Sequence, residues 1–265
     1  MKILLTGAGG LIGSYLYTDI KDRYDVTALY RADLDLMNKN AVESFFRNRY
    51  FDCVIHCAIT GAADIGDPDF NIFRNNWTMY ENVRDQQIKF DRLINIGSGC
   101  EMSYGKENTE LDLYNEYPDQ PYGMSKNMIA RDVLRHDGWV NLRLYGTVGK
   151  NRIFNKIHDA VSAGEATFTM FNDKKMDYIK PADFLKIVNH YIQNSKPKYS
   201  DLNMVYDTKF TVSQVLQQYI TDNNLPLKLK VNPAPVSSES SNNKIRYSNL
   251  DFIGDGSRLK ELGIL

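Results

Sequence analysis

A glycine-rich turn near the N-terminus constrains this chain more than any other feature. Gly7, Gly10 and Gly13 follow the apolar run KILLT and come just before or within a stretch of helical pattern. Glycine suits this context because the strand must turn sharply, the backbone must approach a ligand closely, and the helix must pack tightly on the strand. A pyrophosphate then binds the free N–H groups at the helix start. We therefore interpret the turn as a dinucleotide-binding loop rather than a glycine turn without a ligand.

Apolar runs and amphipathic stretches alternate through the first half of the chain. The apolar runs are KILLTG, DVTALY, CVIHCA, RLINIG and VNLRLYG, and the stretches expected to be helical are 11–22, 39–49, 70–88 and 121–135. Short runs rich in Val, Ile and Leu are typical of buried strands. The alternation predicts an α/β fold, namely a Rossmann-type doubly wound parallel sheet covered by helices on both faces.

The second half of the chain is less regular. Three helices are expected here. One spans 152–163, the second follows a short strand at the start of MDYIKPADFLKIVNHYI, and the third is TVSQVLQQYI. Residues 232–243 are rich in Pro, Ser and Asn and are expected to form an exposed loop, and the final DGSRLKELGIL a capped helix. We expect a dinucleotide-binding Rossmann domain over 1–150 and a small C-terminal substrate-binding lobe over 151–265, interleaved with it.

Charge and cysteine content limit the classes of partner. The net charge is −1, so the chain lacks the basic surplus of proteins that bind nucleic acid or an anionic membrane. No apolar run approaches the roughly 18 residues of a spanning helix, and the first run passes straight into glycines, so we expect no signal peptide. The chain has three cysteines, Cys53, Cys57 and Cys100, and their spacing is not that of metal ligands. This pattern predicts no metal site and favours the cytoplasm.

The end of the second predicted strand bears on the choice of cofactor. NAD-preferring sites usually carry an acidic residue there, bonded to the ribose 2′-hydroxyl. Here the strand ends at Tyr30 and Arg31 follows. An Arg can pair with a 2′-phosphate through its planar fork of donors. We favour NADP, with NAD as the alternative if Arg31 is merely solvated and Asp33 serves the ribose.

A Tyr and a Lys four residues apart open the predicted helix that begins at Pro121. This spacing places the hydroxyl of Tyr122 and the ammonium of Lys126 on one helical face. The pKa of a free phenol is about 10, and a neighbouring cation lowers it, so Lys126 can tune Tyr122 as a general acid or base. Ser98 follows a predicted strand at the edge where open α/β sheets bind ligands. Its hydroxyl could bond a substrate carbonyl.

These residues, taken in chain order, resemble the extended short-chain dehydrogenase/reductase family, which includes nucleotide-sugar epimerases, dehydratases and reductases. TGAGGLIG is similar to the family's cofactor loop, HCA to the segment after its fourth strand, and YGMSK to its Tyr and Lys. LYGTVG and MDYIKPADF resemble later segments. The resemblance implies that Leu11, Ile12 and Ala58 contact the dinucleotide beside the glycines, and that Lys126 also holds the nicotinamide ribose.

Asn76 lies six residues before Asn82, as in the N-x5-N helix of the same family. The resemblance implies that Asn76 faces the active-site region. A surface or capping amide on the helix is the alternative.

The segment around Ser98 narrows the reaction. Ser98, Gly99 and Cys100 stand where the family's sugar dehydratases carry Thr-Asp-Glu, which disfavours dehydration, and Glu101 is one position late. GSGC instead resembles the GDP-fucose synthases, where the Cys moves a proton beside the ketone. In those enzymes a His after the LYG turn is the second base that partners the Cys. It has no counterpart here, because residues 150–152 are Lys-Asn-Arg and His158 lies too far into the next predicted helix. Cys100 is therefore either a catalytic thiol or a structural one.

Residues 32–58 are also similar to the dTDP-4-dehydrorhamnose reductases. Together the resemblances imply NADP-dependent reduction of a nucleotide-linked 4-keto-6-deoxysugar, with Tyr122 as proton donor. A departure is Met176, because the family usually offers an Arg there to the nucleotide diphosphate, and Lys174 or Lys175 would have to compensate. The alternatives are an NAD-dependent nucleotide-sugar 4-epimerase, a bifunctional epimerase/reductase, or a cofactor-binding sensor. By analogy with the family we expect a homodimer through helices 70–88 and 121–135.

Overall fold

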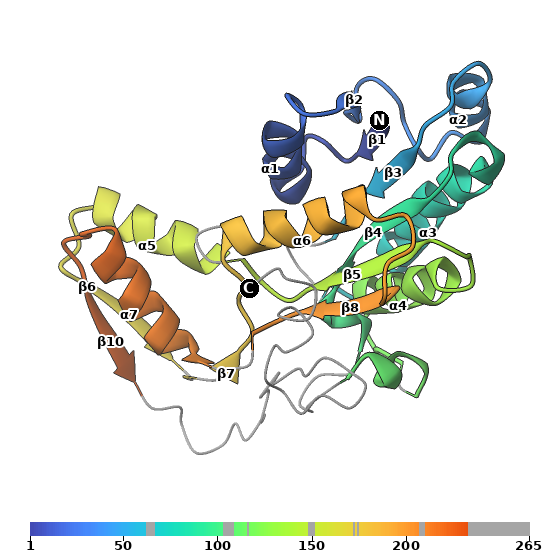
Figure 1. The fold of residues 1–265 in the computed structure, drawn as a ribbon. Helices are drawn as coiled ribbons and strands as arrows, with labels where there is room; N and C mark the ends of the chain where they lie inside the picture. Colours follow the sequence, from blue (N-terminus) through green and yellow to red (C-terminus); the bar gives the residue numbers. More distant parts are fainter. Residues whose placement is uncertain are drawn as a thin grey trace. The chain divides into compact units, whose positions relative to one another are not determined.

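The computed structural model (Figure 1) describes residues 1–61, 67–102, 109–115, 117–147, 152–171, 173, 175–206 and 210–232. The chain divides into two compact units. The first comprises Met1–Ser103, Asp112–Arg143 and Leu185–Leu202, and the second comprises Tyr104–Leu111, Leu144–Phe184 and Asn203–Leu265. The assignment of 151–265 to substrate binding stays a prediction.

A six-stranded sheet organises the first unit. Its order is β2 (Asp25–Leu29), β1 (Lys2–Thr6), β3 (Cys53–His56), β4 (Leu93–Ser98), β5 (Val140–Leu144) and β8 (Asp201–Met204). Strand β1 pairs in parallel with both β2 and β3, and β3 pairs in parallel with β4. The chain therefore leaves β1 toward one edge and returns past it toward the other. In open α/β sheets this point of reversal is where ligands bind.

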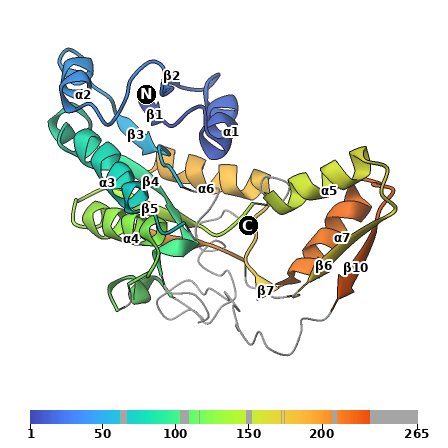
Figure 2. The same ribbon diagram turned by 180° about the vertical axis from the view of Figure 1, so that it is seen from behind.

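Helices cover both faces of this sheet (Figures 1 and 2). Helix α1 (Leu11–Ile20) lies with the C-terminal part of α6 (Pro181–Gln193) on one face, where Asn189 donates a hydrogen bond to the carboxylate of Asp19. Helices α2 (Lys39–Phe46), α3 (Phe70–Arg84) and α4 (Pro121–Val133) lie on the other. The predicted α/β Rossmann-type fold is confirmed.

The apolar core explains why the predicted strands form. Strands β3 and β4 are buried almost throughout, as expected for parallel strands covered on both faces. Leu4, Val54 and Leu93 from three neighbouring strands meet Tyr80 and Val83 of α3 in one buried cluster. All five predicted strands are present, but β8 was not predicted.

The second unit has its own core. Helices α5 (Arg152–Ser162) and α7 (Val212–Asp222) accompany the parallel pair β6 (Thr167–Phe171) and β10 (Lys228–Asn232) and the antiparallel pair β7 (Lys175–Met176) and β9 (Phe210–Thr211). Its buried cluster includes Phe154, Ile157, Leu216 and Ile220. Thr211 caps α7, accepting from the Gln214 N–H at 3.3 Å.

Most predicted helices are confirmed with earlier ends. Helix α3 ends at Arg84, and the chain continues as the short 3₁₀ segment Gln87–Lys89 rather than as the same helix. Further 3₁₀ segments are Gly99–Glu101 and Glu110–Tyr114. The predicted loop at 232–243, apart from Asn232 in β10, and the predicted terminal helix lie outside the described residues.

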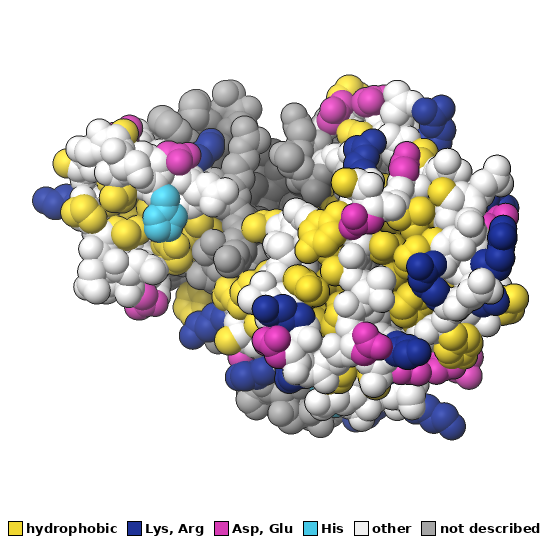
Figure 3. Space-filling view, turned by 90° about the horizontal axis from the view of Figure 1, so that it is seen from above, with side chains coloured by type: hydrophobic (Ala, Val, Ile, Leu, Met, Phe, Trp, Pro, Cys, Tyr) yellow, Lys and Arg dark blue, Asp and Glu magenta, His cyan; other side chains and the backbone are white. Residues whose placement is uncertain are grey.

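The surface shows mixed charge. On the face drawn in Figure 3, lysine and arginine side chains lie among aspartate and glutamate side chains. Every helix in the described part of the chain is too short or too polar to cross a membrane.

Candidate active site

The glycine turn after β1 is built by close approaches of the backbone. Gly7 has a φ of +68°, and a Cβ there would lie 2.6 Å from the backbone nitrogen of Ala58. A Cβ on Gly13 would lie 2.1 Å from the carbonyl oxygen of Gly7. No side chain fits at either position, since real Cβ atoms essentially never come within 3.0 Å of such neighbours. The loop after β1 thus touches the loop after β3 at the reversal point of the sheet.

This turn fits a dinucleotide pyrophosphate. Helix α1 begins at Leu11 with Gly10 as its N-cap, and the Gly10 N–H donates to the carbonyl oxygen of Gly7 at 3.0 Å. The N–H groups of Leu11, Ile12 and Gly13 then lie in the first turn, where a helix offers no acceptor of its own. The positive end of the α1 helix dipole therefore faces the loop.

The end of β2 leaves Arg31 exposed at the surface. The neighbouring carboxylate of Asp33 accepts a hydrogen bond from the Tyr30 N–H at 3.2 Å, and the Asp33 N–H donates to the Tyr30 carbonyl at 3.0 Å. Asp33 therefore closes its own turn. Among the described residues, no acceptor is bonded to the guanidinium of Arg31, so it can approach a phosphate.

Ser98, Tyr122 and Lys126 come together where β4 ends and α4 begins. Ser98 is the last residue of β4, and Tyr122 stands in the first turn of α4 after Pro121. Tyr122 is 5% exposed and hydrogen-bonds Ser98 through its side chain. Lys126 is 1% exposed, and its Nζ donates to the carbonyl oxygen of Ile96 at 2.8 Å. Two adjoining elements therefore supply all three groups.

The pKa of Tyr122 differs from the sequence-based expectation. Burial raises it above its usual value, the adjacent Cys100 adds to the rise, and the hydrogen bond with Ser98 opposes it. Lys126 is not among the groups that shift the pKa of Tyr122, and its ammonium donates to the backbone carbonyl of Ile96. Burial also lowers the pKa of Lys126, while the charge of Glu101 raises it. Tyr122 is thus a protonated phenol at neutral pH.

Cys100 lies beside these groups. It is 7% exposed, and its backbone N–H donates to the Ser98 hydroxyl at 3.2 Å. Its carbonyl oxygen would be 2.6 Å from a Cβ on Gly123, so the turn packs directly on the start of α4. Whether the thiol takes part in catalysis stays a prediction.

Cys53 and Cys57 differ from a reactive thiol, because burial raises the pKa of each to about 12.

The side-chain amide of Asn76 lies inside the protein and not at its surface. It is fully buried; its Oδ1 accepts from the Thr60 N–H at 2.7 Å, and its Nδ2 donates to the Thr60 carbonyl at 3.1 Å. The same Nδ2 donates to Ser125 Oγ at 3.0 Å, and Ser125 donates to the Tyr122 carbonyl at 2.7 Å. Asn76 therefore ties the loop after β3 to the helix that carries Tyr122.

A buried ion pair at the site was missed in the sequence. Glu101 and Arg143 are both fully buried, and Arg143 Nε donates to Glu101 Oε2 at 2.7 Å. Arg143 Nη2 also contacts Asp201 at 3.0 Å, and Asn141 Nδ2 donates to Glu101 at 2.9 Å. The signal was available, because a charge within a strand buried on both faces requires a partner.

Other predicted elements lie in the second unit or outside the described residues. His158 Nε2 is 2.7 Å from the Tyr219 hydroxyl, between α5 and α7. The stretch 148–151 and position 174 lie outside the described residues, and so do the side chains of 152, 175 and 176. The expectation that Lys174 or Lys175 replaces an Arg at Met176 stays a prediction.

A profile of the NAD dependent epimerase/dehydratase family matches residues 3–204. This stretch holds the glycine turn, Ser98, Tyr122 and Lys126. The chain belongs to the NAD dependent epimerase/dehydratase family. It is an NAD(P)-dependent enzyme of the extended short-chain dehydrogenase type, as the sequence resemblance predicted.

Relatives and solved structures of this family cover most of the chain. CDP-abequose synthase from Yersinia pseudotuberculosis is 25% identical over 253 residues, or 86% of this chain and 87% of that protein. GDP-L-fucose synthase from Azorhizobium caulinodans is 28% identical over 218 residues, or 71% and 69%. A GDP-mannoheptose C4 reductase from Campylobacter jejuni with NADP bound aligns with a TM-score of 0.78 at 18% identity, over 99% of this chain and 92% of that one. The structural likeness shows a shared fold.

His56 predicts an acid-sensitive contribution to stability. It is fully buried at the end of β3, with Nδ1 3.0 Å from the Thr6 hydroxyl, and burial lowers its pKa to about 3. An unfolded His has a pKa of about 6.5. The contribution of neutral His56 is therefore complete above pH 6.5 and is lost as the pH falls from there toward 3.

We expect His56→Gln to reduce the slope of the unfolding free energy against pH between about pH 6 and 4.5. The reduction corresponds to at most one bound proton, or about 1.4 kcal/mol per pH unit. Denaturant unfolding at several pH values measures this slope. The control His158→Gln, at an exposed histidine, should retain the wild-type slope. Parallel curves for the wild type and His56→Gln would contradict the argument.

Proposed function

We propose that this protein is an NADP-dependent reductase of a nucleotide-linked 4-keto-6-deoxysugar. The observation that carries the proposal is the grouping of Ser98, Tyr122 and Lys126 at one end of β4. The similar proteins named above are two nucleotide-sugar synthases and a C4 reductase with NADP bound. The cysteines are free thiols, which fits the predicted cytoplasmic location.

The chain's residues have distinct roles in this proposal. The first turn of α1 and the glycines hold the pyrophosphate, Ala58 borders the loop, and Arg31 binds the 2′-phosphate. The bound nicotinamide supplies a hydride to the keto carbon. Ser98 donates a hydrogen bond to the carbonyl oxygen, and Tyr122 protonates the alkoxide that forms there. Lys126 holds the nicotinamide ribose.

The protonation state of Tyr122 fits the role of a proton donor in reduction. A group that gives a proton to a new alkoxide must hold that proton beforehand. Burial raises the pKa of Tyr122, so its phenol is intact at neutral pH. A 4-epimerase would use the same group first as a base and then as an acid, so the phenol does not separate the two reactions. Arg31, which stands where NAD-preferring sites usually carry an acidic residue, disfavours the NAD-dependent 4-epimerase. A 4-epimerase or a bifunctional enzyme is therefore the second candidate, and a sensor without chemistry the third.

NADPH should bind more tightly than NADH. Arg31 is exposed and the Asp33 carboxylate is bonded within its own turn. A charge-assisted pair with a 2′-phosphate contributes about 1.5–3 kcal/mol, or about tenfold to a hundredfold in affinity. Fluorescence titration of both cofactors tests this, with Arg31→Ser expected to weaken NADPH binding and leave NADH binding almost unchanged. Tighter binding of NADH to the wild type would reject the preference.

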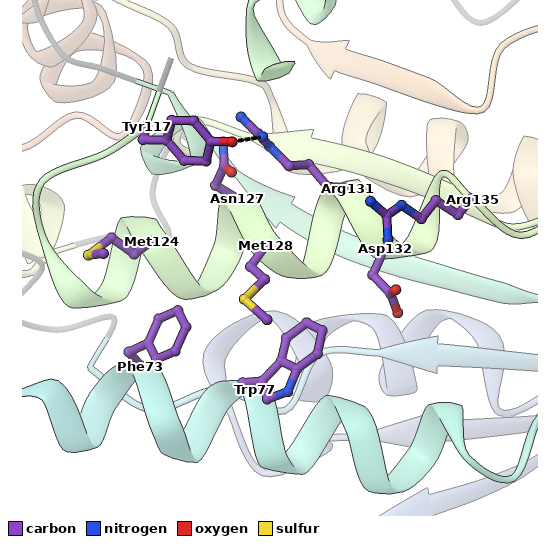
Figure 4. Close-up of a pocket in the computed structure, with 9 residues that line it drawn as sticks. All are labelled: Phe73, Trp77, Tyr117, Met124, Asn127, Met128, Arg131, Asp132 and Arg135. Carbon is purple, nitrogen blue, oxygen red and sulfur yellow. Dashed lines mark hydrogen bonds between the residues drawn. The ribbon is translucent and has the colours of Figure 1, made fainter. Parts of the chain in front are cut away.

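We also propose that the protein is a homodimer paired through α3 and α4. A hollow of about 400 Å³ lies between these helices, lined by Phe73, Trp77, Met124 and Met128 with Arg131 and other polar groups at its rim. In Figure 4 the two methionines of α4 face Phe73 and Trp77 of α3, and Arg131 bonds the Tyr117 hydroxyl at 2.5 Å. Apolar side chains that remain accessible on two neighbouring helices fit an interface between copies.

Light scattering at micromolar concentration should give the mass of a dimer. Met128→Glu, at a residue 38% exposed, should shift the mass to a monomer by placing a charge in the interface. Phe210→Glu, at a residue 46% exposed in the other unit, is the control and should leave the dimer intact. A monomeric wild type, or a dimeric Met128→Glu, would rule out pairing through this face.

Turnover with a panel of GDP-, dTDP- and CDP-linked 4-keto-6-deoxysugars tests the reaction directly. We expect NADPH consumption with at least one sugar, followed at the nicotinamide absorbance band. Tyr122→Phe should lower turnover about a hundredfold or more with cofactor binding nearly intact, because only the proton donor is removed. Lys126→Ala should impair both turnover and cofactor binding.

Solvent deuterium separates reduction from epimerisation. A reductase leaves the C3 and C5 hydrogens in place, whereas an enzyme that epimerises exchanges them. We expect no exchange. Exchange that disappears in Cys100→Ser would instead establish the bifunctional enzyme. Interconversion of two UDP-sugars with NAD, and no reduction of any sugar, would favour the 4-epimerase.

A further inference from the structure

The turn that follows β4 depends on one buried carboxylate. Ser98, Gly99 and Cys100 form this turn, and the Ser98 N–H donates to Glu101 Oε1 at 2.6 Å. The carbonyl of Glu101 accepts from Asn127 Nδ2 of α4 at 2.7 Å. Glu101 therefore bonds the first residue of the turn through its side chain and helix α4 through its backbone.

The space for this carboxylate is reserved by Gly97. A Cβ on Gly97 would lie 2.4 Å from Glu101 Oε1 and 2.7 Å from Asn141 Oδ1. Any side chain at position 97 would therefore displace the carboxylate. Glycine is required here for the space that it leaves to the Glu101 carboxylate. It is not required for a left-handed backbone, because Gly97 does not have positive φ.

Both carboxylate oxygens of Glu101 already accept hydrogen bonds from N–H donors. Oε1 accepts from Ser98, and Oε2 accepts from Arg143 and Asn141. Three N–H donors therefore orient this fully buried carboxylate. Bonds of this kind suit Glu101 to fixing the geometry of the turn.

We propose that Glu101, anchored by Arg143, is a positioning residue that fixes Ser98 and Cys100 against the helix that carries Tyr122. This inference rests on the proposed reductase function. It extends that function to residues that do not touch the substrate. Misplacement of reacting groups by about 1 Å can lower a rate about a hundredfold, so a fixed turn matters to the reaction.

A role in stability alone explains this arrangement poorly. Replacing a buried ion pair with apolar residues of similar volume is often neutral or stabilising. Arg143 has a second carboxylate partner in Asp201, so Glu101 is not needed to give Arg143 a counter-ion. What Glu101 adds is the bond to Ser98 and a negative charge near Lys126.

Lys126 gives a second consequence. Glu101 and Cys100 face it from the turn after β4, Cys57 and His56 from the end of β3, and Tyr122 from its own helix. Of these, Glu101 raises the pKa of Lys126 most strongly. Burial lowers the pKa of Lys126 and the charge of Glu101 opposes this. Removal of that charge lowers the pKa of Lys126 further, so the ammonium is lost at a lower pH.

Glu101→Gln tests the proposal in the full chain. Its amide places an NH₂ group against either Ser98 or the Arg143 and Asn141 donors, so one set of bonds is lost. We expect amide exchange at Ser98 and Cys100, measured by NMR, to accelerate about tenfold or more, while amides of β1 and β3 stay protected. Asp201→Asn is the matched control, since it removes a carboxylate from the same Arg143 but leaves the Ser98 bond in place.

Cofactor binding and turnover complete the test. As the pH rises, NADPH affinity in Glu101→Gln should decline at a lower pH than in the wild type. Glu101→Asp keeps the negative charge but withdraws it from Ser98. This variant should therefore retain the wild-type pH midpoint of NADPH binding and show fast amide exchange at Ser98. Exchange that accelerates equally throughout the chain, with an unchanged pH midpoint, would overturn the proposal in favour of a structural role. If Glu101→Gln does not fold, the Glu101→Asp exchange pattern decides. These readouts need no sugar, so failure to reduce any substrate is distinguishable from failure of this inference.

Discussion

Contact between two backbone turns at the centre of the sheet determines how this site can be built. Gly7 leaves β1 in a left-handed conformation and lies against Ala58, which follows β3. The adjacent strands must end at the same level for these turns to meet, and the register of β1 on β3 brings Thr6 opposite His56. The exclusion of side chains at Gly7 and Gly13 therefore fixes the place of α1 as well as the loop.

Polar side chains extend from this contact across a sheet that is otherwise apolar. Thr6 on β1 bonds His56 on β3, and Asn95 on β4 donates to Asn141 on β5 at 2.6 Å. Asn141 in turn reaches Asp201 at 3.1 Å. Buried polar groups cost free energy unless they are paired. Members of this row bond one another or the Glu101–Arg143 pair, whereas His56 Nε2 and Asn95 Oδ1 have no hydrogen-bond partner among the described residues. The row ends at this ion pair, whose Glu101 bonds the Ser98 N–H and raises the pKa of Lys126.

Sequence reasoning predicted the fold and the residues of the site but not the interactions that hold them. The glycine turn, Ser98, Tyr122 and Lys126 follow from local patterns of a few residues, and the structure groups the last three at one end of β4. Strand β8 was not recognised, because DLNM carries only two apolar residues and its place is set by pairing at the edge of the sheet. Arg143 in a buried strand signals that a charged partner exists, but the partner Glu101 is 42 residues away and no local pattern identifies it.

The environment of Tyr122 changes the expected relation between the Tyr and the Lys. Sequence spacing suggested that Lys126 acts on the phenol directly, by lowering its pKa. In the structure, burial and the neighbouring Cys100 keep the phenol protonated, and Lys126 is bonded to the Ile96 carbonyl and lies near the charge of Glu101. The two residues share a helical face, yet their pKa values respond to different neighbours. An alkoxide formed beside Tyr122 is a far stronger base than phenolate, so it takes the proton without any prior lowering of the pKa. A site arranged in this way can give a proton to the alkoxide formed by reduction, as the proposed reductase requires.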